Sequence, residues 1–168
     1  MKISRVLFSV VCLCLLFGVA MAGEKKISKK QIPSAVLTAF KTDYPNATIK
    51  GQAVETEKGK KYYEIESVDG KTSRDLLYTP DGKISEIEED MDLTTVPAEM
   101  KGAADKAYPG GKLVKAEKVT AGTSVKYELH VKVGKKTKEV VLDASGKIMK
   151  AAKKGGEEDE EKGEEEED

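Results

Sequence analysis

Cysteine, histidine and long apolar runs are all scarce in this chain of 168 residues. Its two cysteines, Cys12 and Cys14, both lie in the one long apolar run, which covers residues 6–20. Without that run the chain has no cysteine, so its core must hold without disulfides. The single histidine has no cysteine or second histidine with which to complete a zinc site. No later segment is apolar enough to span a bilayer.

The first 22 residues have the pattern of a secretory signal peptide. Lys2 and Arg5 precede the apolar run, and Ala20-Met21-Ala22 after it fits an A-x-A cleavage site. We therefore expect cleavage between Ala22 and Gly23, which leaves 146 residues and sends the protein to the periplasm or outside the cell. A retained membrane anchor is the less favoured alternative, because the run is shorter than the roughly 20 residues that a spanning helix needs.

Charge is unevenly distributed, although the chain has 29 basic and 30 acidic residues in total. Residues 32–92 have 13 acidic and 8 basic side chains, whereas residues 93–154 have 6 acidic and 14 basic ones. Residues 157–168 hold ten acidic residues and one lysine. We predict a disordered, solubilising acidic tail over residues 155–168. The alternative is a tail that folds back onto the basic second half at low salt.

The chain also repeats itself. Residues 31–89 align with residues 95–153 without a gap, at an offset of 64 positions. Tyr44-Pro45, for example, recurs as Tyr108-Pro109. The shared positions are apolar residues, prolines and turn glycines, which are what a fold needs to be built twice, and none is an obvious catalytic group.

Each repeat is predicted to open with a helix. In the first copy Val36, Phe40 and Tyr44 recur every four residues, as one apolar face of a helix requires, and the second copy has the same spacing. Pro33 suits the first helical turn, where its missing N–H is not needed. Pro45 disfavours the helical conformation in the tyrosine before it, so the helix is expected to end there.

Four strands are predicted after each helix. They cover residues 47–57, 60–68, 72–79 and 83–89 in the first copy, and residues 112–120, 123–133, 136–143 and 147–151 in the second. Apolar and polar residues alternate most clearly from Val125 to Lys132. Turn signals such as Thr79-Pro80-Asp81-Gly82 separate the strands. This order predicts an α+β fold with two tandem helix-plus-four-stranded antiparallel meander repeats.

The order of elements, with the motifs IP…YP, KYYEIE, VKYELHV, PDGKI and SGKI, resembles the PepSY-like family, also called β-lactamase-inhibitor-like. The resemblance covers residues 31–153. It implies a bacterial protein in which the two sheets can join into one curved sheet with the helices on one face. The predicted organisation is a basic segment at residues 23–30, repeats at residues 31–92 and 93–154, and the acidic tail.

Catalytic and metal-binding motifs are not supported by the residues. His130 is expected to be solvated on the polar side of its strand, and Glu128 beside it has no nucleophile elbow to serve, so we do not expect an enzyme. An EF-hand loop ending near Asp81-Gly82 would need an acidic residue at Leu77. Weak divalent-cation binding by residues 86–92 or by the tail stays an alternative. No cofactor is expected, and without interleaved aromatic residues no nucleic acid is expected either.

The resemblance implies a binding protein, because related β-lactamase inhibitors grip their enzyme with the open sheet face and PepSY modules are thought to restrain peptidases. We therefore predict an exported, non-enzymatic module that binds an envelope or extracellular protein by steric occlusion. The alternatives are an envelope protein that buffers or senses cations through its acidic segments and, less favoured, a hydrolase. The candidate binding face consists of polar residues of the second strands. They are Tyr62, Glu64, Glu66, Lys126, Glu128, His130 and Lys132.

Overall fold

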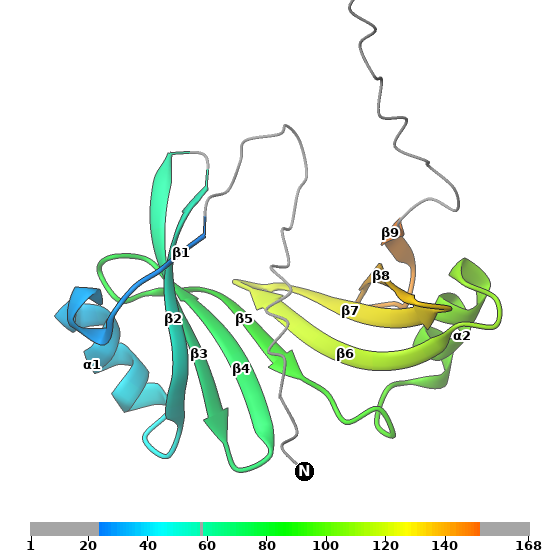
Figure 1. The fold of residues 1–168 in the computed structure, drawn as a ribbon, viewed down its shortest axis with the longest axis horizontal. Coiled ribbons are helices and arrows are strands. Elements are labelled where there is room, and N and C mark those ends of the chain that lie inside the picture. Colours follow the sequence, from blue (N-terminus) through cyan, green and yellow to red (C-terminus); the bar gives the residue numbers. More distant parts are fainter. Residues whose placement is uncertain (1–23, 58, 152–168) are drawn as a thin grey trace, which may run out of the picture. The chain divides into compact units, whose positions relative to one another are not determined.

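The computed structural model describes residues 24–57 and 59–151 (Figure 1). The predicted signal peptide, its cleavage site and the predicted acidic tail lie outside these residues. Within them the chain forms an open, mainly antiparallel sheet and two α-helices, which confirms the predicted α+β class. No helix in this part of the chain is long and apolar enough to cross a membrane.

Nine strands of the described residues follow one another in the sheet in chain order, from β1 to β9. They are β1 Lys25–Lys26, β2 Thr48–Glu57, β3 Lys60–Asp69, β4 Thr72–Tyr78, β5 Ile84–Asp90, β6 Lys112–Ala121, β7 Ser124–Val133, β8 Lys136–Asp143 and β9 Ile148–Ala151. The helices are α1 Ser34–Asp43 and α2 Ala98–Ala107, and a short 3-10 helix, η1, covers Lys29–Gln31. Strands β2 to β9 lie within one residue of the predicted strands, whereas β1 and η1 are additions to the prediction.

The chain divides into two compact units, one ending at Ile87 and the other beginning at Glu88. We call them unit 1 and unit 2. The division falls within β5, a few residues before the predicted repeat boundary at 92/93, which stays a prediction. Unit 1 contains α1 and unit 2 contains α2.

In unit 1, helix α1 packs against β3 and β4. Pro33 is the N-cap rather than a residue of the first turn, and the helix ends at Asp43, with Tyr44 as its C-cap before Pro45. The apolar face predicted from the four-residue spacing is the buried one. The core consists of Ile32, Val36, Phe40, Ile65, Leu76 and Tyr78. The rings of Phe40 and Tyr44 stack with centroids 5.9 Å apart, and the Arg74 guanidinium lies 5.4 Å from the centre of the Tyr44 ring.

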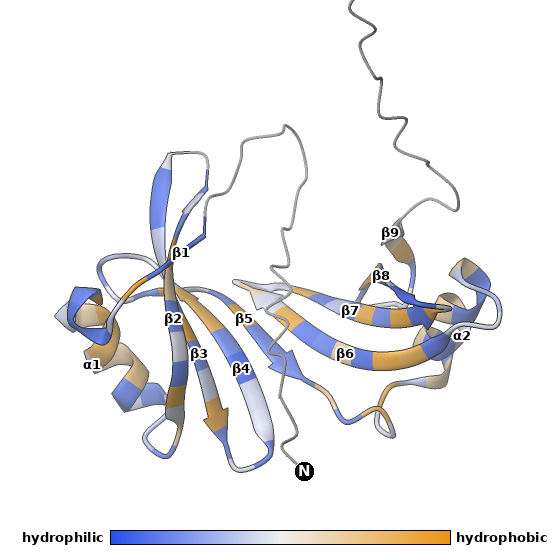
Figure 2. Ribbon diagram, in the orientation of Figure 1, coloured by the Kyte–Doolittle hydropathy of each residue, from blue (hydrophilic) through white to orange (hydrophobic). Residues whose placement is uncertain are grey.

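In unit 2, helix α2 buries Met100 and Ala104 against the sheet. The core consists of Val96, Met100, Ala104, Tyr108, Ala116, Leu129, Val131, Val140 and Leu142. Polar and apolar residues alternate along β7 (Figure 2), where Tyr127, Leu129 and Val131 face the core. The residues between them on β7 therefore lie on the face turned away from α2.

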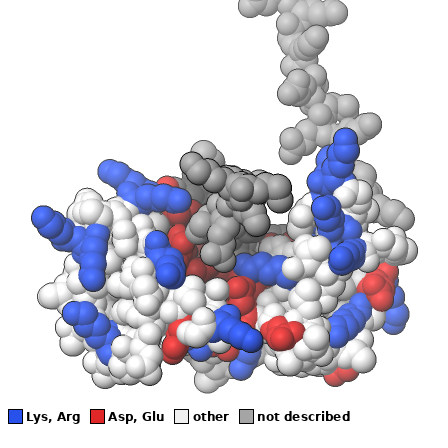
Figure 3. All heavy atoms as spheres, turned by 60° about the horizontal axis from the view of Figure 1, so that its bottom comes forward, with Lys and Arg blue, Asp and Glu red and all other residues white. Residues whose placement is uncertain are grey.

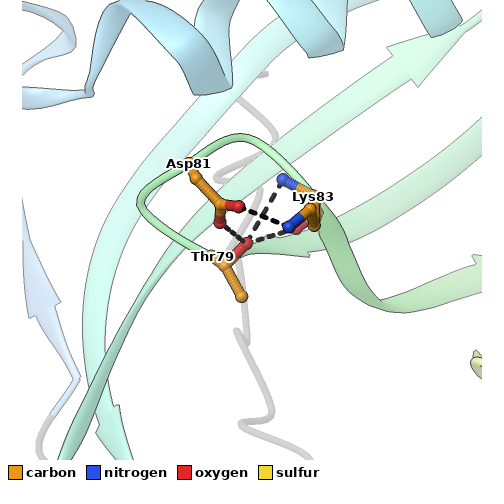
Figure 4. Close-up of polar contacts among 3 residues, drawn as sticks. All are labelled: Thr79, Asp81 and Lys83. Carbon is orange, nitrogen blue, oxygen red and sulfur yellow. Dashed lines mark hydrogen bonds and ion pairs between the residues drawn. The ribbon is translucent and has the colours of Figure 1, made fainter.

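Side chains of the β4–β5 hairpin close its turn (Figure 4). Thr79 Oγ1 donates a hydrogen bond to Asp81 Oδ1 at 2.5 Å and accepts one from the Lys83 N–H at 3.2 Å. Lys83 Nζ lies 2.8 Å from Asp81 Oδ2. Hydrogen bonds from Lys83 and Thr79 lower the pKa of Asp81 to about 2. Because these partners belong to the same turn, the role of Asp81 is to stabilise the hairpin.

The β8–β9 hairpin makes the equivalent closure with different side chains. Asp143 Oδ1 accepts hydrogen bonds from the N–H groups of Ser145 and Lys147, at 2.8 and 3.0 Å. Gly82 and Gly146 have φ of +85° and +80° in the two turns, where a side chain is strained. The two hairpins therefore share a backbone conformation but differ in the group that holds it.

Candidate binding face

The candidate residues of unit 1 lie on the sheet face opposite α1, which we call the helix-free face. Residues directly opposite each other on neighbouring antiparallel strands share a face. Glu55 on β2 pairs with Tyr62 on β3, and Asp75 on β4 pairs with Glu66. Tyr62, Glu64 and Glu66 are all half-buried there. This face of unit 1 therefore concentrates carboxylates around a tyrosine.

Glu64 is the most perturbed of these carboxylates. Desolvation by burial raises its pKa, and the nearby negative charges of Asp75, Glu55, Glu24 and Glu66 raise it further, to about 8. Its Oε2 atom is buried and has no hydrogen-bond partner among the described residues. Glu64 is therefore largely protonated and neutral at pH 7.

The candidate residues of unit 2 lie in different surroundings. His130 Nε2 lies 3.1 Å from Glu117 Oε2, and Lys115 Nζ lies 2.6 Å from Glu117 Oε1. Glu117 and His130 are each only 4% exposed. Burial acts to raise the pKa of Glu117, but hydrogen bonds from His130 and Lys115 outweigh it and hold the pKa below its ordinary value. Glu117 is therefore ionised and paired.

The expectation that His130 is solvated is wrong, because it is buried beside Glu117. Glu128 is also fully buried, whereas Lys126 is half-buried and Lys132 is exposed. A partner can therefore reach Lys132 directly, but it cannot reach Glu128 or His130 without a rearrangement. The predicted face is accessible only in part.

Lys115 and Glu117 are missing from the predicted set, which included only residues of the second strands, and a β-bulge brings both of them to this face. The register of β6 against β7 shifts between Leu113 and Lys115. Leu113 packs against the core, so unbroken alternation would place Lys115 and Glu117 on that side as well. The bulge moves them to the helix-free face beside His130. The sequence does contain a signal of this bulge, because uninterrupted alternation would place two charged residues in the core.

Unit 2 also contains a cavity of about 250 Å³ next to α2. It is lined by Leu93, Lys101, Ala104, Asp105, Leu113 and Val131. Ala104 occupies the repeat position of Phe40, and its small side chain helps to leave this space. The lining mixes apolar residues with one base and one acid.

Residues 21–86 and 61–150 each match the protein family described as "Putative beta-lactamase-inhibitor-like, PepSY-like". The chain belongs to this family. No curated protein matches it.

Several solved structures are similar to this chain. A protein described as "putative periplasmic", from Bacteroides eggerthii DSM 20697, aligns with a TM-score of 0.60 and 21% identity over 71% of this chain and 87% of that one. A DUF2874 family protein from Bacteroides uniformis ATCC 8492 gives 0.59 and 18%, covering 71% and 88%. A BLIP-like protein from Bacteroides fragilis NCTC 9343 gives 0.55 and 19%, covering 71% and 85%. At these identities the likeness shows a shared fold.

Proposed function

We propose that the protein is an exported, non-enzymatic binding module that acts by occupying the surface or cleft of a partner protein. The observation that carries this proposal is family membership over residues 21–86 and 61–150, supported by a fold shared with a BLIP-like protein. The fold shared with a protein described as periplasmic supports a periplasmic or secreted location. We also infer that residues 31–92 and 93–154 are two copies of one helix-plus-meander module, with the curved, joined sheet that the resemblance implies.

The surroundings of His130 argue against a hydrolase. It is the only histidine of the chain, and it is buried with its Nε2 held by the Glu117 carboxylate. A general base must come within hydrogen-bond reach of the proton that it removes. In this position His130 stabilises an internal ion pair, so the geometry favours a structural role.

The binding face that we propose is centred on Tyr62 in unit 1 and on Lys126 and Lys132 in unit 2. Tyr62 is half-buried, which suits an anchor that gains contact area without first losing much freedom. The two lysines are the accessible members of the unit 2 set. Their charges are expected to act mainly on association rate and partner choice.

A pull-down from an envelope fraction tests this proposal. The immobilised protein should retain one protein stoichiometrically, and both Tyr62→Ala and a double Lys126→Glu, Lys132→Glu variant should retain much less. Lys118→Glu is the matched control, because Lys118 is exposed on β6 but pairs with Tyr127 outside the proposed face. Retention that is unchanged in both test variants, or lost equally in the control, would place the binding site elsewhere.

Cation binding is the second candidate function, and one observation favours it. Four carboxylates act electrostatically on Glu64, and a cation could relieve their repulsion. A calcium titration followed by calorimetry tests this function, with Glu64→Gln as the test variant and Glu99→Gln, at an exposed position of α2, as the control. Saturable binding that Glu64→Gln weakens selectively would favour cation binding. Equal, weak heat in all three proteins would exclude this site.

A further inference from the structure

One end of the sheet in unit 2 carries four exposed lysines. They are Lys112, Lys132, Lys135 and Lys136. We call this group the lysine end. Figure 3 shows separate groups of Lys and Arg side chains at the surface of unit 2, on the right of that view. The strand register brings these lysines to one end of the sheet, with Lys112 and Lys132 on the helix-free face and Lys136 on the opposite face.

The register places like charges opposite each other. Lys112 at the start of β6 pairs directly with Lys132 near the end of β7, and Thr137 rather than a carboxylate lies opposite Lys132 on β8. Lys136 pairs with Val133, whose side chain is 40% exposed. Like charges directly opposite each other destabilise a sheet. This arrangement therefore favours a negatively charged group from outside the strands.

The last described strand, β9, runs toward this lysine end. Strand β9 is antiparallel to β8, and Ala151 pairs with Val140. Because β8 starts at Lys136, four residues before Val140, strand β9 runs toward Lys136. Four strand residues span about 14 Å. The five residues 152–156 can extend up to about 17 Å, so residue 157 can reach the lysine end.

Residues 157–168 have the charge that the lysine end lacks, with ten acidic residues and one lysine. A short tether gives a segment an effective concentration in the millimolar range at a nearby site. Attraction between solvent-exposed charges is strong at low ionic strength and is screened over about 8 Å at physiological salt. The short tether and the opposite charges therefore both favour binding of this segment to the lysine end.

We propose that the acidic segment 157–168 covers the lysine end of unit 2 and competes there with acidic surfaces of other molecules. This interaction goes beyond the proposed function, because it holds whether or not a partner protein exists. The interaction of this segment with the lysine end is strongest at low salt and weakens as the salt concentration rises. It makes the accessibility of Lys132 depend on ionic strength.

A labelled synthetic peptide with the sequence of residues 157–168 tests the proposal by fluorescence anisotropy at low salt. The full chain is compared with a full-length variant in which the ten acids of that segment are replaced by Gln or Asn. The neutralised chain should bind the peptide at least about tenfold more tightly, because the tethered competitor has lost its charge. Raising the salt to 0.5 M should abolish the difference.

Charge reversal locates the site. In the neutralised chain, a triple Lys112→Glu, Lys132→Glu, Lys136→Glu variant should lose peptide binding. A triple reversal at Lys106, Lys118 and Lys147, which are also exposed in unit 2, should keep most of it. If the reversal variants unfold in a circular dichroism melt, the lysines of both triple variants are changed to Gln instead of Glu. Equal peptide affinity for the full and neutralised chains, or equal loss from both triple variants, overturns the proposal. The second outcome would mean diffuse charge attraction that any acidic molecule could satisfy.

Discussion

Glu64 in unit 1 and Glu117 in unit 2 both lie on a helix-free sheet face, yet their surroundings are opposite. Glu64 is crowded by carboxylates, and its pKa rises to about 8. Glu117 has Lys115 and His130 as partners, and its pKa falls. In the aligned repeats, His130 stands where unit 1 has Glu66, and Glu117 stands where it has Ala53. These two exchanges, together with Lys115 at the repeat position of Gly51, give unit 2 a buried, paired carboxylate, whereas unit 1 has a crowded one that holds a proton.

The cores of the two units differ in a similar way. Phe40 fills the core of unit 1, whereas Ala104 at the same repeat position borders the cavity of unit 2. Both helices bury the same face, so the difference lies in side-chain volume. The two units therefore share a backbone pattern but fill their cores with side chains of different size.

The largest expected effect is that of Phe40→Ala. Phe40 is 3% exposed, and truncation of a buried aromatic side chain lowers the free energy of unfolding by about 3–5 kcal/mol. Urea unfolding measures this change. Ala104→Leu is the matched substitution, and we expect it to change stability by less than about 1.5 kcal/mol because the cavity can accept the added carbons. A change below about 0.5 kcal/mol for Phe40→Ala would show that the core of unit 1 is assigned incorrectly.

Glu117→Ala should follow in size, with a loss of about 3 kcal/mol, because it removes the buried carboxylate that pairs with His130. Lys115 is 39% exposed and keeps Asp90 at 3.5 Å, so it adds little to this loss. The folded-state pKa of Glu117 lies below the ordinary value of 4.5, so its contribution is present above that value and is lost as pH falls through the folded-state pKa. Chemical unfolding at pH 7 and pH 3 should therefore show a smaller difference from the wild type at pH 3. An equal difference at both pH values would mean that the ion pair does not stabilise the fold.

Alanine in place of the two hairpin glycines gives a smaller contrast. Both substitutions force a side chain into the left-handed region, at about 1–2 kcal/mol each. A Cβ at Gly82 would also lie 2.7 Å from the Ala35 carbonyl oxygen, whereas at Gly146 the nearest atom is 3.6 Å away. Gly82→Ala should therefore lower the melting temperature more than Gly146→Ala. The reverse order would contradict the close approach of this hairpin to α1.

Much of the fold could be predicted from the sequence, because its signals are local. The four-residue spacing of Val36 and Phe40 identified the buried face of α1, and turn glycines separated the strands. The short strand β1 was not predicted, since Lys25 and Lys26 have no apolar pattern and are held by pairing with β2. The formation of β1 therefore depends on contacts with residues that are distant in the sequence.

Less of the candidate site could be predicted. Alternation correctly assigned Glu64 and His130 to one kind of face, but it could not show how deeply each is buried. The bulge between Leu113 and Lys115 reverses the alternation, so the pairing of Glu117 with His130 depends on register rather than on composition. The protonation of Glu64 depends on carboxylates from three strands and from the segment before β1, which only the folded sheet brings together.

Glu64→Gln should have the smallest effect, and its sign is opposite to that of the other substitutions. The folded state retains the Glu64 proton between the ordinary pKa of 4.5 and about 8, whereas the unfolded state loses it, so wild-type stability falls as pH rises through this window. Gln does not ionise. We expect the variant to be more stable than the wild type by about 1 kcal/mol at pH 8.5, a value reduced for partial solvent access, and nearly equal at pH 4.

The contrast between the two units is tested most directly by NMR titration of the side-chain carboxyl carbons of Glu64 and Glu117 in the same sample. We predict that the Glu64 resonance shifts with a midpoint near pH 8 and that Glu117 titrates below the ordinary glutamate value. If Glu64 and Glu117 titrate with the same midpoint, the two faces do not differ in electrostatics and this account of the site is wrong.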